Sequence, residues 1–302
     1  MLEQLRGLVV FAEVVDGKSF ARAAERLGMT RSAVSKHVAQ LEAQLGVQLL
    51  SRTTRKLSLT EVGERVYSAS TDVREAAELA REAAHTHQGM VEGTLRVTAP
   101  VGLGRPYLIP LADELMRLHP RLEIALILSD QYVDLVEERI DVALRVGHAL
   151  DSSLVTRKIA PMTMAFCAAP RYLAEHGTPK QPRDLEAHPV IRHLPRLDGG
   201  KTTLRNGRRS AQLELTGRLS CNDGATSVAA AVHGMGVFVG PEFEFAHEVR
   251  AGRLARVLVG WTTDVLTLHA VSPPRRHVSS KVRTFVDFVG ERWRKPPWSL
   301  AK

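Results

Sequence analysis

The stretch from Ser19 to Arg55 decides the fold of the amino-terminal part of the chain, and it reads SFARAAERLGMTRSAVSKHVAQLEAQLGVQLLSRTTR. Two short helical patterns meet at Gly28-Met29-Thr30. Glycine suits the left-handed backbone that ends a helix, and threonine suits the cap that begins the next one. Ser19 stands in the capping position of the first of these helices. We therefore predict a helix-turn-helix whose second helix reads the major groove of DNA.

The second helix of this motif has two contrasting faces. Its apolar residues recur with helical period and are expected to bury against Phe20, Ala24 and Leu27: Val34, Val38, Leu41 and Leu45. The other face and its flank carry short polar, amide and cationic side chains: Arg31, Ser32, Ser35, Lys36, Ala39 and Gln40. No carboxylate occurs before Glu42, so this face suits base edges and phosphates. An ordinary solvated helix of a helical bundle is the alternative, which the turn and the missing acids disfavour.

The segment after Gly46, VQLLSRTTRKLSLT, alternates and turns like a two-stranded ribbon. A basic ribbon beside a recognition helix is interpreted as a wing on the DNA backbone or minor groove. Between Arg31 and Lys56 there are five basic residues and one acid, a net charge of +4 out of the chain's +8. An anionic membrane is the alternative partner, but no long amphipathic helix with an aromatic face accompanies these charges. The predicted DNA contacts are Thr30, Arg31, Ser32, Ser35, Lys36, Gln40, Arg52, Thr54, Arg55 and Lys56.

Two further helices are predicted around this motif. Leu2 to Val15 has an apolar face that should pack on the helix-turn-helix. From Glu61 to about Thr86, small and apolar residues alternate at four- and three-residue steps: Val62, Val66, Ala69, Val73, Ala76, Ala80 and Ala83. This spacing predicts a helix of about 40 Å that pairs with its copy in a dimer. A helix packed on its own chain's core remains the alternative, since the seam has few bulky residues.

Composition sets the broad class. A chain of 302 residues with 44% hydrophobic residues can form two or three domains with real cores, and a pI near 9.8 favours a polyanionic partner. Cys167 and Cys221 lie in apolar runs, which predicts buried reduced thiols; a redox sensor is the alternative. The sequence has no signal-peptide layout and no stretch of transmembrane length, so we expect a cytoplasmic protein.

Beyond His87 to Gly93 the pattern changes to alternating short strands and helices. A βαβαβ pattern covers Thr94 to Val146, with helices expected over Leu108 to Leu118 and Val133 to Arg139. A second α/β set begins after Ala160-Pro161 and includes a hairpin at Asn206-Gly207.

Enzymatic motifs are not found in the sequence. It has no serine nucleophile elbow, phosphate loop, HExxH or paired-cysteine spacing. His85 and His87 point to different faces of a helix, and the Gly102-x-Gly104 pair lacks the third glycine of a dinucleotide loop. We therefore expect no enzyme, no metal and no cofactor. A solute-binding protein or an enzyme of two-lobed fold is the rival class, but neither needs a basic amino-terminal head.

These features together resemble the LysR-type transcriptional regulators over essentially the whole chain. The head follows the family pattern LE..LG..L..R..R...LT..G between Leu41 and Gly63. The later pieces APVGLGRPYLIP, DLVEERIDVALRVG and DSSLVTRK resemble the family's effector-binding half. This sequence departs from the family in having Arg31 where Gln is frequent, Lys36 where Arg is frequent and Leu50 where Phe is frequent. Lys36 keeps the charge but lacks the planar fork that reads guanine bidentately.

The resemblance implies three parts. A winged helix-turn-helix domain covers 1–60, a dimerising linker helix covers 61–88, and a two-lobed α/β domain like a periplasmic binding protein covers 89–302. Lobe I would comprise 93–160 and 269–302, and lobe II 161–268, with crossovers near Ala160-Pro161 and Leu268 to Ala270. It further implies a homodimer or homotetramer, promoter DNA with interrupted palindromes, a small-molecule effector, and RNA polymerase as a further partner.

The effector is expected where strands of an open α/β sheet end and helices begin. The candidate residues are Pro100, Val101, Gly102, Ser129, Asp130, Arg145, Val146, His193, Asn222, Asp223, Gly240 and Pro241. Arg145 is the candidate anchor for a carboxylate effector; the alternative is an ion pair with Asp141 or Asp130. His193 could instead be a structural histidine, and Asp223 a helix cap.

Overall fold

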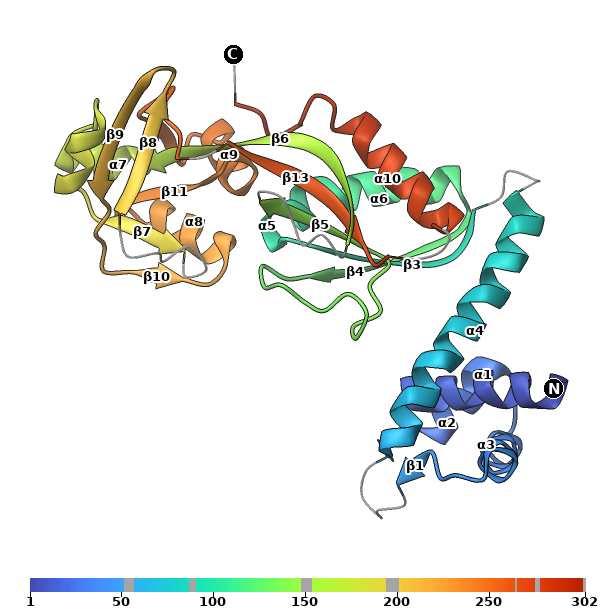
Figure 1. The fold of residues 1–302 in the computed structure, drawn as a ribbon. Helices are drawn as coiled ribbons and strands as arrows, with labels where there is room; N and C mark the ends of the chain where they lie inside the picture. The colour runs from blue at the N-terminus through green and yellow to red at the C-terminus, as the bar shows by residue number, and fades with distance from the viewer. Residues whose placement is uncertain are drawn as a thin grey trace. The chain divides into compact units, whose positions relative to one another are not determined.

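A computed structural model describes residues 1–51, 57–86, 91–147, 154–193, 201–263, 265–274 and 278–300. The chain forms two compact units, 1–89 and 90–302, which we describe one at a time (Figure 1). Within the described residues, no helix has both the length and the apolar character needed to span a membrane.

The amino-terminal unit contains the predicted helix-turn-helix. Ser19 accepts a hydrogen bond from the amide of Ala21 at the start of α2, and Thr30 accepts one from Ala33 at the start of α3. Gly28, with φ of 60°, ends α2 as the sequence predicted. The elements are α1 (Leu2–Gly17), α2 (Phe20–Leu27), α3 (Arg31–Leu45), the antiparallel pair β1 (Leu50–Ser51) and β2 (Ser58–Leu59), and α4 (Glu61–Thr86). The predicted ribbon tip, 52–56, lies outside the described residues.

The core of this unit is formed by α1, α2, α3 and β1. On α3 the predicted apolar face is buried, with Val34, Val38 and Leu41 at most 3% exposed and Leu45 partly buried. On α1, Phe11 and Val14 are fully buried. Burial of these side chains fixes which face of α3 is left outside.

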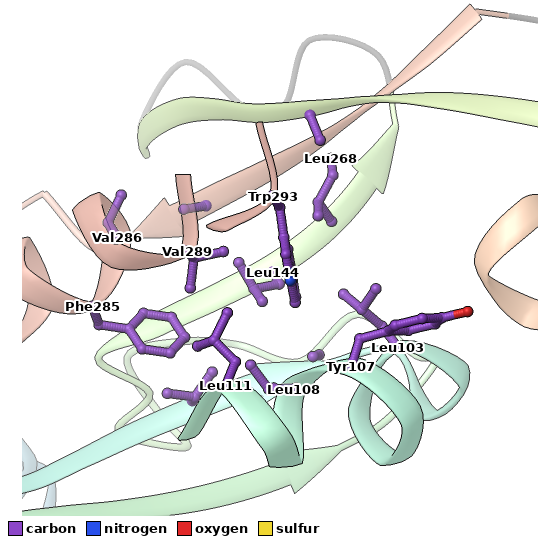
Figure 2. Packing of buried hydrophobic residues seen from close by; sticks show 14 of the residues in the cluster. Leu103, Tyr107, Leu108, Leu111, Leu144, Leu268, Phe285, Val286, Val289 and Trp293 are labelled. Carbon is purple, nitrogen blue, oxygen red and sulfur yellow. The ribbon is translucent and has the colours of Figure 1, made fainter. Parts of the chain in front are cut away.

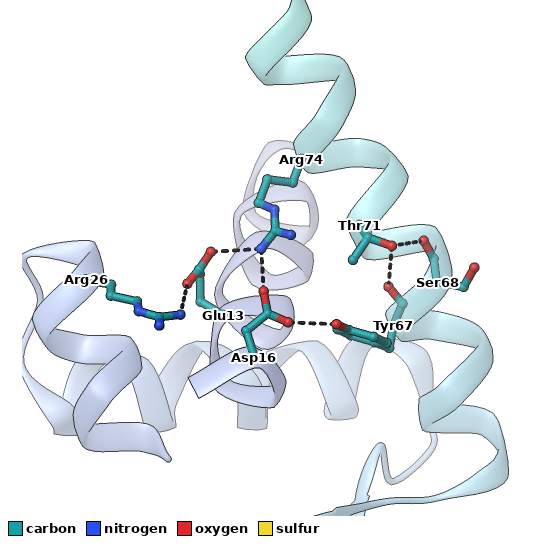
Figure 3. Close-up of polar contacts among 7 residues, drawn as sticks. All are labelled: Glu13, Asp16, Arg26, Tyr67, Ser68, Thr71 and Arg74. Atoms are coloured by element: carbon teal, nitrogen blue, oxygen red, sulfur yellow. Dashed lines mark hydrogen bonds and ion pairs between the residues drawn. The ribbon is translucent and has the colours of Figure 1, made fainter. Parts of the chain in front are cut away.

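A polar cluster joins α4 to α1. The Arg74 Nη1 atom donates to Glu13 Oε1 at 2.8 Å and to Asp16 Oδ2 at 2.7 Å, and the Tyr67 hydroxyl donates to Asp16 Oδ1 at 2.7 Å (Figure 3). Arg26 of α2 also pairs with Glu13, at 3.7 Å. The Asp16 side chain is 2% exposed, and burial raises its pKa against the opposing effect of Arg74. The first part of α4 is therefore held on its own chain by charge-assisted hydrogen bonds.

The residues predicted to form the dimerisation seam of α4 are different from Tyr67 and Arg74, which bind α1. Val66 packs against the core of the unit, Val73 is half-buried, and Val62, Ala69 and Ala76 are exposed. This helix is therefore compatible with packing on its own chain and with pairing in a dimer. Part of it packs on its own chain, and a stripe of small residues on its outer side is exposed to solvent. The side chains of Ala80 and Ala83 lie outside the described set.

The second unit is built on one sheet with the strand order β10-β7-β11-β6-β13-β5-β3-β4, and β12 pairs with β6. The strands β3, β4 and β5 are parallel, as predicted, whereas β13 runs antiparallel to β5 and β6. The strands are β3 (Glu92–Ala99), β4 (Arg121–Leu128), β5 (Val142–Gly147), β6 (Val155–Ala168), β7 (Val190–His193), β10 (Ser220–Cys221), β11 (Val237–Pro241), β12 (Ala255–Val257) and β13 (Val265–Ser272). The predicted hairpin is β8 (Lys201–Asn206) and β9 (Arg209–Glu214), with Gly207 at φ of 58°.

Helices pack on this sheet, and most of the buried side chains fall into two cores. The helices are α5 (Val101–Leu103), the π-helix η1 (Gly104–Leu108), α6 (Ile109–Leu118), α7 (Pro170–His176), the 3-10 helix η2 (Pro182–Ala187), α8 (Gly224–Val232), α9 (Glu242–Arg250) and α10 (Ser280–Arg292). One core packs α6 and α10 against β3, β5 and β13, with Leu108, Leu144 and Phe285 fully buried (Figure 2). A second core gathers around Phe166, Phe238 and Phe245. The strand β6 enters both cores, pairing with β13 along its first part and with β11 and β12 at its end. The exact lobe limits remain a prediction.

The predicted helix over Val133–Arg139 is wrong. Residues 135–139 form a single hydrogen-bonded turn. The Asp134 carboxylate accepts from the amides of Val136 and Glu137, and Arg139, at φ of 53°, ends the turn. Leu135 and Ile140 enter a core and Val133 packs against it, but Val136 is 69% exposed. These positions do not form an apolar stripe that would extend a helix.

Candidate DNA-binding surface and interlobe site

The polar face of α3 is open to solvent. Every predicted contact on this helix is exposed: Thr30, Arg31, Ser32, Ser35, Lys36 and Gln40. Thr30 has a second task, because its hydroxyl lies 3.0 Å from that of Ser32 and caps the helix through Ala33. The helix start also contributes unpaired amides and the positive end of the helix dipole. Together these groups form a surface that attracts phosphate.

The one acid of α3 is turned away from that surface. The Glu42 carboxylate accepts from the backbone amides of Leu49 at 2.7 Å and Leu50 at 3.1 Å, where β1 begins. A carboxylate held by two amides cannot also extend toward DNA. The sequence indicated that no acid precedes Glu42, but the structure shows what that residue does.

The base of the wing is tied to the start of α4. The Thr60 hydroxyl donates to the Gln48 carbonyl at 2.7 Å and accepts from the Gly63 amide at 2.9 Å. A Cβ at Gly63 would lie 2.1 Å from the Leu49 carbonyl oxygen, so only glycine permits this approach. The predicted contacts at the tip, Arg52, Thr54, Arg55 and Lys56, lie outside the described residues.

In the second unit, Asp130 joins two helices that belong to different cores. Its Oδ1 atom accepts from the Val101 amide at 2.9 Å, and its Oδ2 atom accepts from the Gly224 amide at 3.0 Å. Val101 begins the helical segment that runs through η1 and α6, whereas Gly224 begins α8. The predicted pair Val101 and Asp130 is thus brought together, and Gly224 is a partner that the sequence did not identify.

Arg145 is buried, at 6% exposure, and binds oxygens of its own chain. It donates to the Ser129 carbonyl at 2.9 Å, the Gln131 carbonyl at 3.2 Å and the Thr98 hydroxyl at 3.2 Å. Burial lowers the pKa of its guanidinium, and the nearby Tyr132 and Asp130 oppose that effect. These bonds hold the segment after β4 in place. Asp141, the other proposed partner, binds the Arg96 amide and lies 3.5 Å from Lys281 instead.

Glu244 of α9 is a buried residue of this site that the sequence analysis missed. A Cβ at Gly102 would lie 1.9 Å from its Oε2 atom, and a Cβ at Gly224 would lie 2.3 Å from its Cδ atom. Its carboxylate therefore packs against the starts of both helices. The only signal in the sequence was an acidic residue within the apolar run from Phe243 to Ala246. The composition of that run is typical of a buried helix.

A pocket of about 490 Å³ lies beside these groups, between the segment that starts at α5 and the helices α8 and α9. Glu248 accepts from Arg253 and lies 2.9 Å from His247 Nε2, and the Arg253 hydrogen bond lowers the pKa of Glu248. The lining is formed by Val101, Gly102, Arg105, Pro106, Ala225, Val228, Ala229, Val232, His233, Glu244, His247, Glu248 and Arg253. The volume is in the range of small-molecule sites.

The other predicted effector residues have varied positions. Asp223 caps α8 by accepting from the Thr226 amide at 2.8 Å, which was its alternative role. His193 pairs with Cys221 in the sheet, but its side chain lies outside the described set. Pro100, Val146 and Pro241 are half-buried, Asn222 is exposed, and Gly240 is packed under the Phe238 ring. Among the described residues, no group of three or more His, Cys, Asp or Glu could hold a metal ion.

Comparisons with known proteins match both units. Residues 5–64 fit the model of the bacterial regulatory helix-turn-helix protein, lysR family, and residues 88–294 fit the LysR substrate binding domain. The HTH-type transcriptional regulator PtxR of Pseudomonas aeruginosa is 33% identical over 298 residues, covering 99% of this chain and 96% of that protein. The HTH-type transcriptional regulator DmlR of Escherichia coli is 33% identical over 290 residues, covering 95% and 94%.

Solved structures agree with these matches. The structure of CrgA, a LysR-type transcriptional regulator from Neisseria meningitidis, has a TM-score of 0.61 and 30% identity, covering 95% of this chain and 98% of that one. The full-length structure of the Vibrio cholerae virulence activator AphB has a TM-score of 0.57 and 27% identity, covering 94% and 98%. With the two family models covering most of its length, the chain belongs to the LysR family of transcriptional regulators, which are DNA-binding proteins and not enzymes.

Proposed function

We propose that this regulator reads promoter DNA with the exposed face of α3 and contacts the DNA backbone with the ribbon β1–β2. The observation that supports this proposal is the position of Glu42. Its carboxylate binds the Leu49 and Leu50 amides, so the single acid of α3 does not lie on the polar face. Arg31 and Lys36 then have no carboxylate of the same helix to neutralise them on that face.

The side chains on this face have different expected roles. Lys36 and Arg31 would neutralise phosphates, which gives affinity that depends on salt. Ser32, Ser35 and Gln40 have the donors and acceptors that base edges recognise in the major groove. Thr30 would position the helix end, and Arg52, Thr54, Arg55 and Lys56 would reach the backbone or minor groove from the wing.

Members of this family form oligomers, and we propose that α4 makes the contact in this chain. Its exposed stripe of Val62, Ala69 and Ala76 has the small residues that let two helices approach closely. A pair of α3 helices would then read the two halves of a palindrome. Dimer and tetramer both fit this contact, RNA polymerase is a further proposed partner, and a cytoplasmic location follows from the DNA partner.

We further propose that the effector binds between the two lobes, with the pocket beside α5, α8 and α9 as the available volume. This pocket joins elements of both cores, because Leu108 follows α5 in the first core and Val228 of α8 lies in the second. A ligand there could change the relation of the lobes. A carboxylate held by Arg145 remains a prediction from the sequence, and three N–H donors of Arg145 already bind oxygens of its own chain.

Fluorescence anisotropy with the DNA upstream of the protein's own gene tests the DNA-binding surface, at several salt concentrations. Lys36→Ala should weaken binding to every sequence and reduce the salt slope by about 1, while Ser35→Ala should reduce the preference for the operator. Arg117→Ala is the matched control, because Arg117 is a 78% exposed cation on α6 of the other unit. Binding that is equally strong in Lys36→Ala, or equally weakened in Arg117→Ala, would contradict the proposed surface.

A further inference from the structure

The amino ends of two helices meet at a position where an anion is normally bound. The Val101 and Gly224 amides point at one acceptor group, 2.9 and 3.0 Å away. Helix amino ends favour anions through their free amides and their dipoles. Here the anion is supplied by the chain itself, as the carboxylate of Asp130.

Asp130 makes these two bonds across the lobes. Val101 is 29 residues away and begins the helical segment of the first core, whereas Gly224 is 94 residues away and begins α8 of the second. Each oxygen of the carboxylate is used by one lobe. Hydrogen bonds to an ionised acceptor are about twice as strong as neutral ones, so this single side chain ties the two lobes together.

The space beside Asp130 holds a second carboxylate. Glu244 is 7% exposed and packs so closely on Gly102 and Gly224 that a Cβ at either position would meet its carboxyl group. An acidic ligand would have to displace the Asp130 carboxylate from two amides and still lie beside it and the Glu244 carboxyl group. Like charges at such distances repel, most strongly where water is excluded.

Arg145 is buried against oxygens of its own chain, so it offers an incoming acid little contact. Its three hydrogen bonds go to oxygens of residues 98, 129 and 131, in a side chain that is 6% exposed. These bonds use three of its five N–H donors, and its burial leaves little surface for an incoming acid. At the helix ends, a negatively charged ligand would therefore meet the carboxyl groups of Asp130 and Glu244 and would gain little contact with Arg145.

We propose that Asp130 is a specificity-determining residue of the interlobe site: it occupies the anion position between the two helix ends, excludes acidic effectors from it, and leaves the site to a neutral or cationic effector. This inference rests on the proposed effector site and names the class of ligand for it. It differs from the carboxylate effector that the sequence suggested.

The test is chemical rescue by a small carboxylate. In Asp130→Ala the two amides lose their acceptor, and sodium formate can supply one. The melting temperature of the second unit is followed by tryptophan fluorescence, because Trp261, Trp293 and Trp298 all lie in it. Formate at about five times its Kd should raise this temperature by about 2–4 °C over sodium chloride of equal ionic strength. The wild type should show no such rise.

Asp134→Ala is the matched control. Asp134 also accepts from two backbone amides, at 2.8 and 3.0 Å, but within one turn of the first lobe. Rescue confined to Asp130→Ala supports the proposal. Equal stabilisation of the wild type by formate, or no response in Asp130→Ala, overturns it.

Asp130→Asn keeps the size of the side chain and serves if the alanine variant does not fold. Its single oxygen can satisfy one amide fully, so hydrogen exchange at Val101 or Gly224 should become roughly tenfold faster than in the wild type. Unchanged protection of both amides overturns the proposal. DNA binding, measured separately by anisotropy, shows whether the proposed DNA-binding function itself fails.

Discussion

Replacing Arg74 by methionine should destabilise the amino-terminal unit while leaving the second unit intact. Methionine keeps the length and helix propensity of the side chain but removes the guanidinium that binds Asp16 and Glu13. Removing one partner of a buried pair costs about 3–5 kcal/mol. Arg74 is 21% exposed and Glu13 16%, which reduces the expected loss to about 2–3 kcal/mol. For a unit of this size, that lowers the melting temperature by roughly 10–20 °C.

The loss should depend on pH in a defined direction. Burial already raises the pKa of Asp16, and Arg74 is the largest opposing influence, so the variant raises this pKa further. A carboxyl group with a raised pKa binds more protons in the folded state. Stability then increases as pH falls. The deficit of Arg74→Met should be largest at neutral pH and shrink as pH falls toward about 4, the ordinary carboxyl pKa.

Circular dichroism at 222 nm reports helices of both units, and tryptophan fluorescence reports the second unit alone. In Arg74→Met, the circular dichroism signal should show a transition at lower temperature than in the wild type. The fluorescence transition should be unchanged. Arg65→Met is the control on the same helix: its pair with Glu61 is 75% and 85% exposed and contributes at most about 0.5 kcal/mol. Two results would refute this prediction: a melting temperature of Arg74→Met equal to that of Arg65→Met, or a loss of stability in Arg74→Met that is the same at pH 5 and pH 7.5.

Two further predictions concern the wing. Gly63→Ala places a Cβ 2.1 Å from the Leu49 carbonyl and should destabilise the amino-terminal unit by about 1–3 kcal/mol, measured by urea unfolding; a stability equal to wild type would contradict the close approach. Glu42→Ala leaves the Leu49 and Leu50 amides without their acceptor, so DNA affinity should fall roughly 5- to 30-fold as the ribbon loses its anchor. An unchanged affinity would show that Glu42 does not position the wing.

Much of the fold could be predicted from the sequence because local signals and buried faces agree. Ser19, Gly28 and Thr30 mark helix ends that depend only on nearby backbone, and the structure places them there. The failed helix at Val133 to Arg139 had a helical composition, but in the structure Val133 and Leu135 face a core while Val136 is 69% exposed. Tertiary burial decides such short segments, and no local pattern reveals it.

The interlobe site was predictable as a place but not as a set of contacts. Val101 and Asp130 were predicted because each follows the end of a strand, and the topology brings such strand ends to one edge of the sheet. Gly224 and Glu244 come from distant positions, and their approach depends on how two cores pack. Arg145 was conspicuous as a charge in an apolar strand, yet two of its three partners are carbonyl oxygens, which leave no trace in a sequence.

The first core also determines when the chain can finish folding. It joins Leu95 and Leu144 to Phe285, Trp293 and Trp298, from opposite ends of the second unit. During synthesis these last side chains leave the ribosome after everything they pack against, whereas the core around Phe166 and Phe238 can close earlier. Until β13 arrives, β5 presents an open strand edge that is able to pair with another nascent chain. A chain that is released before Val265 is made would therefore have a first lobe with this open edge.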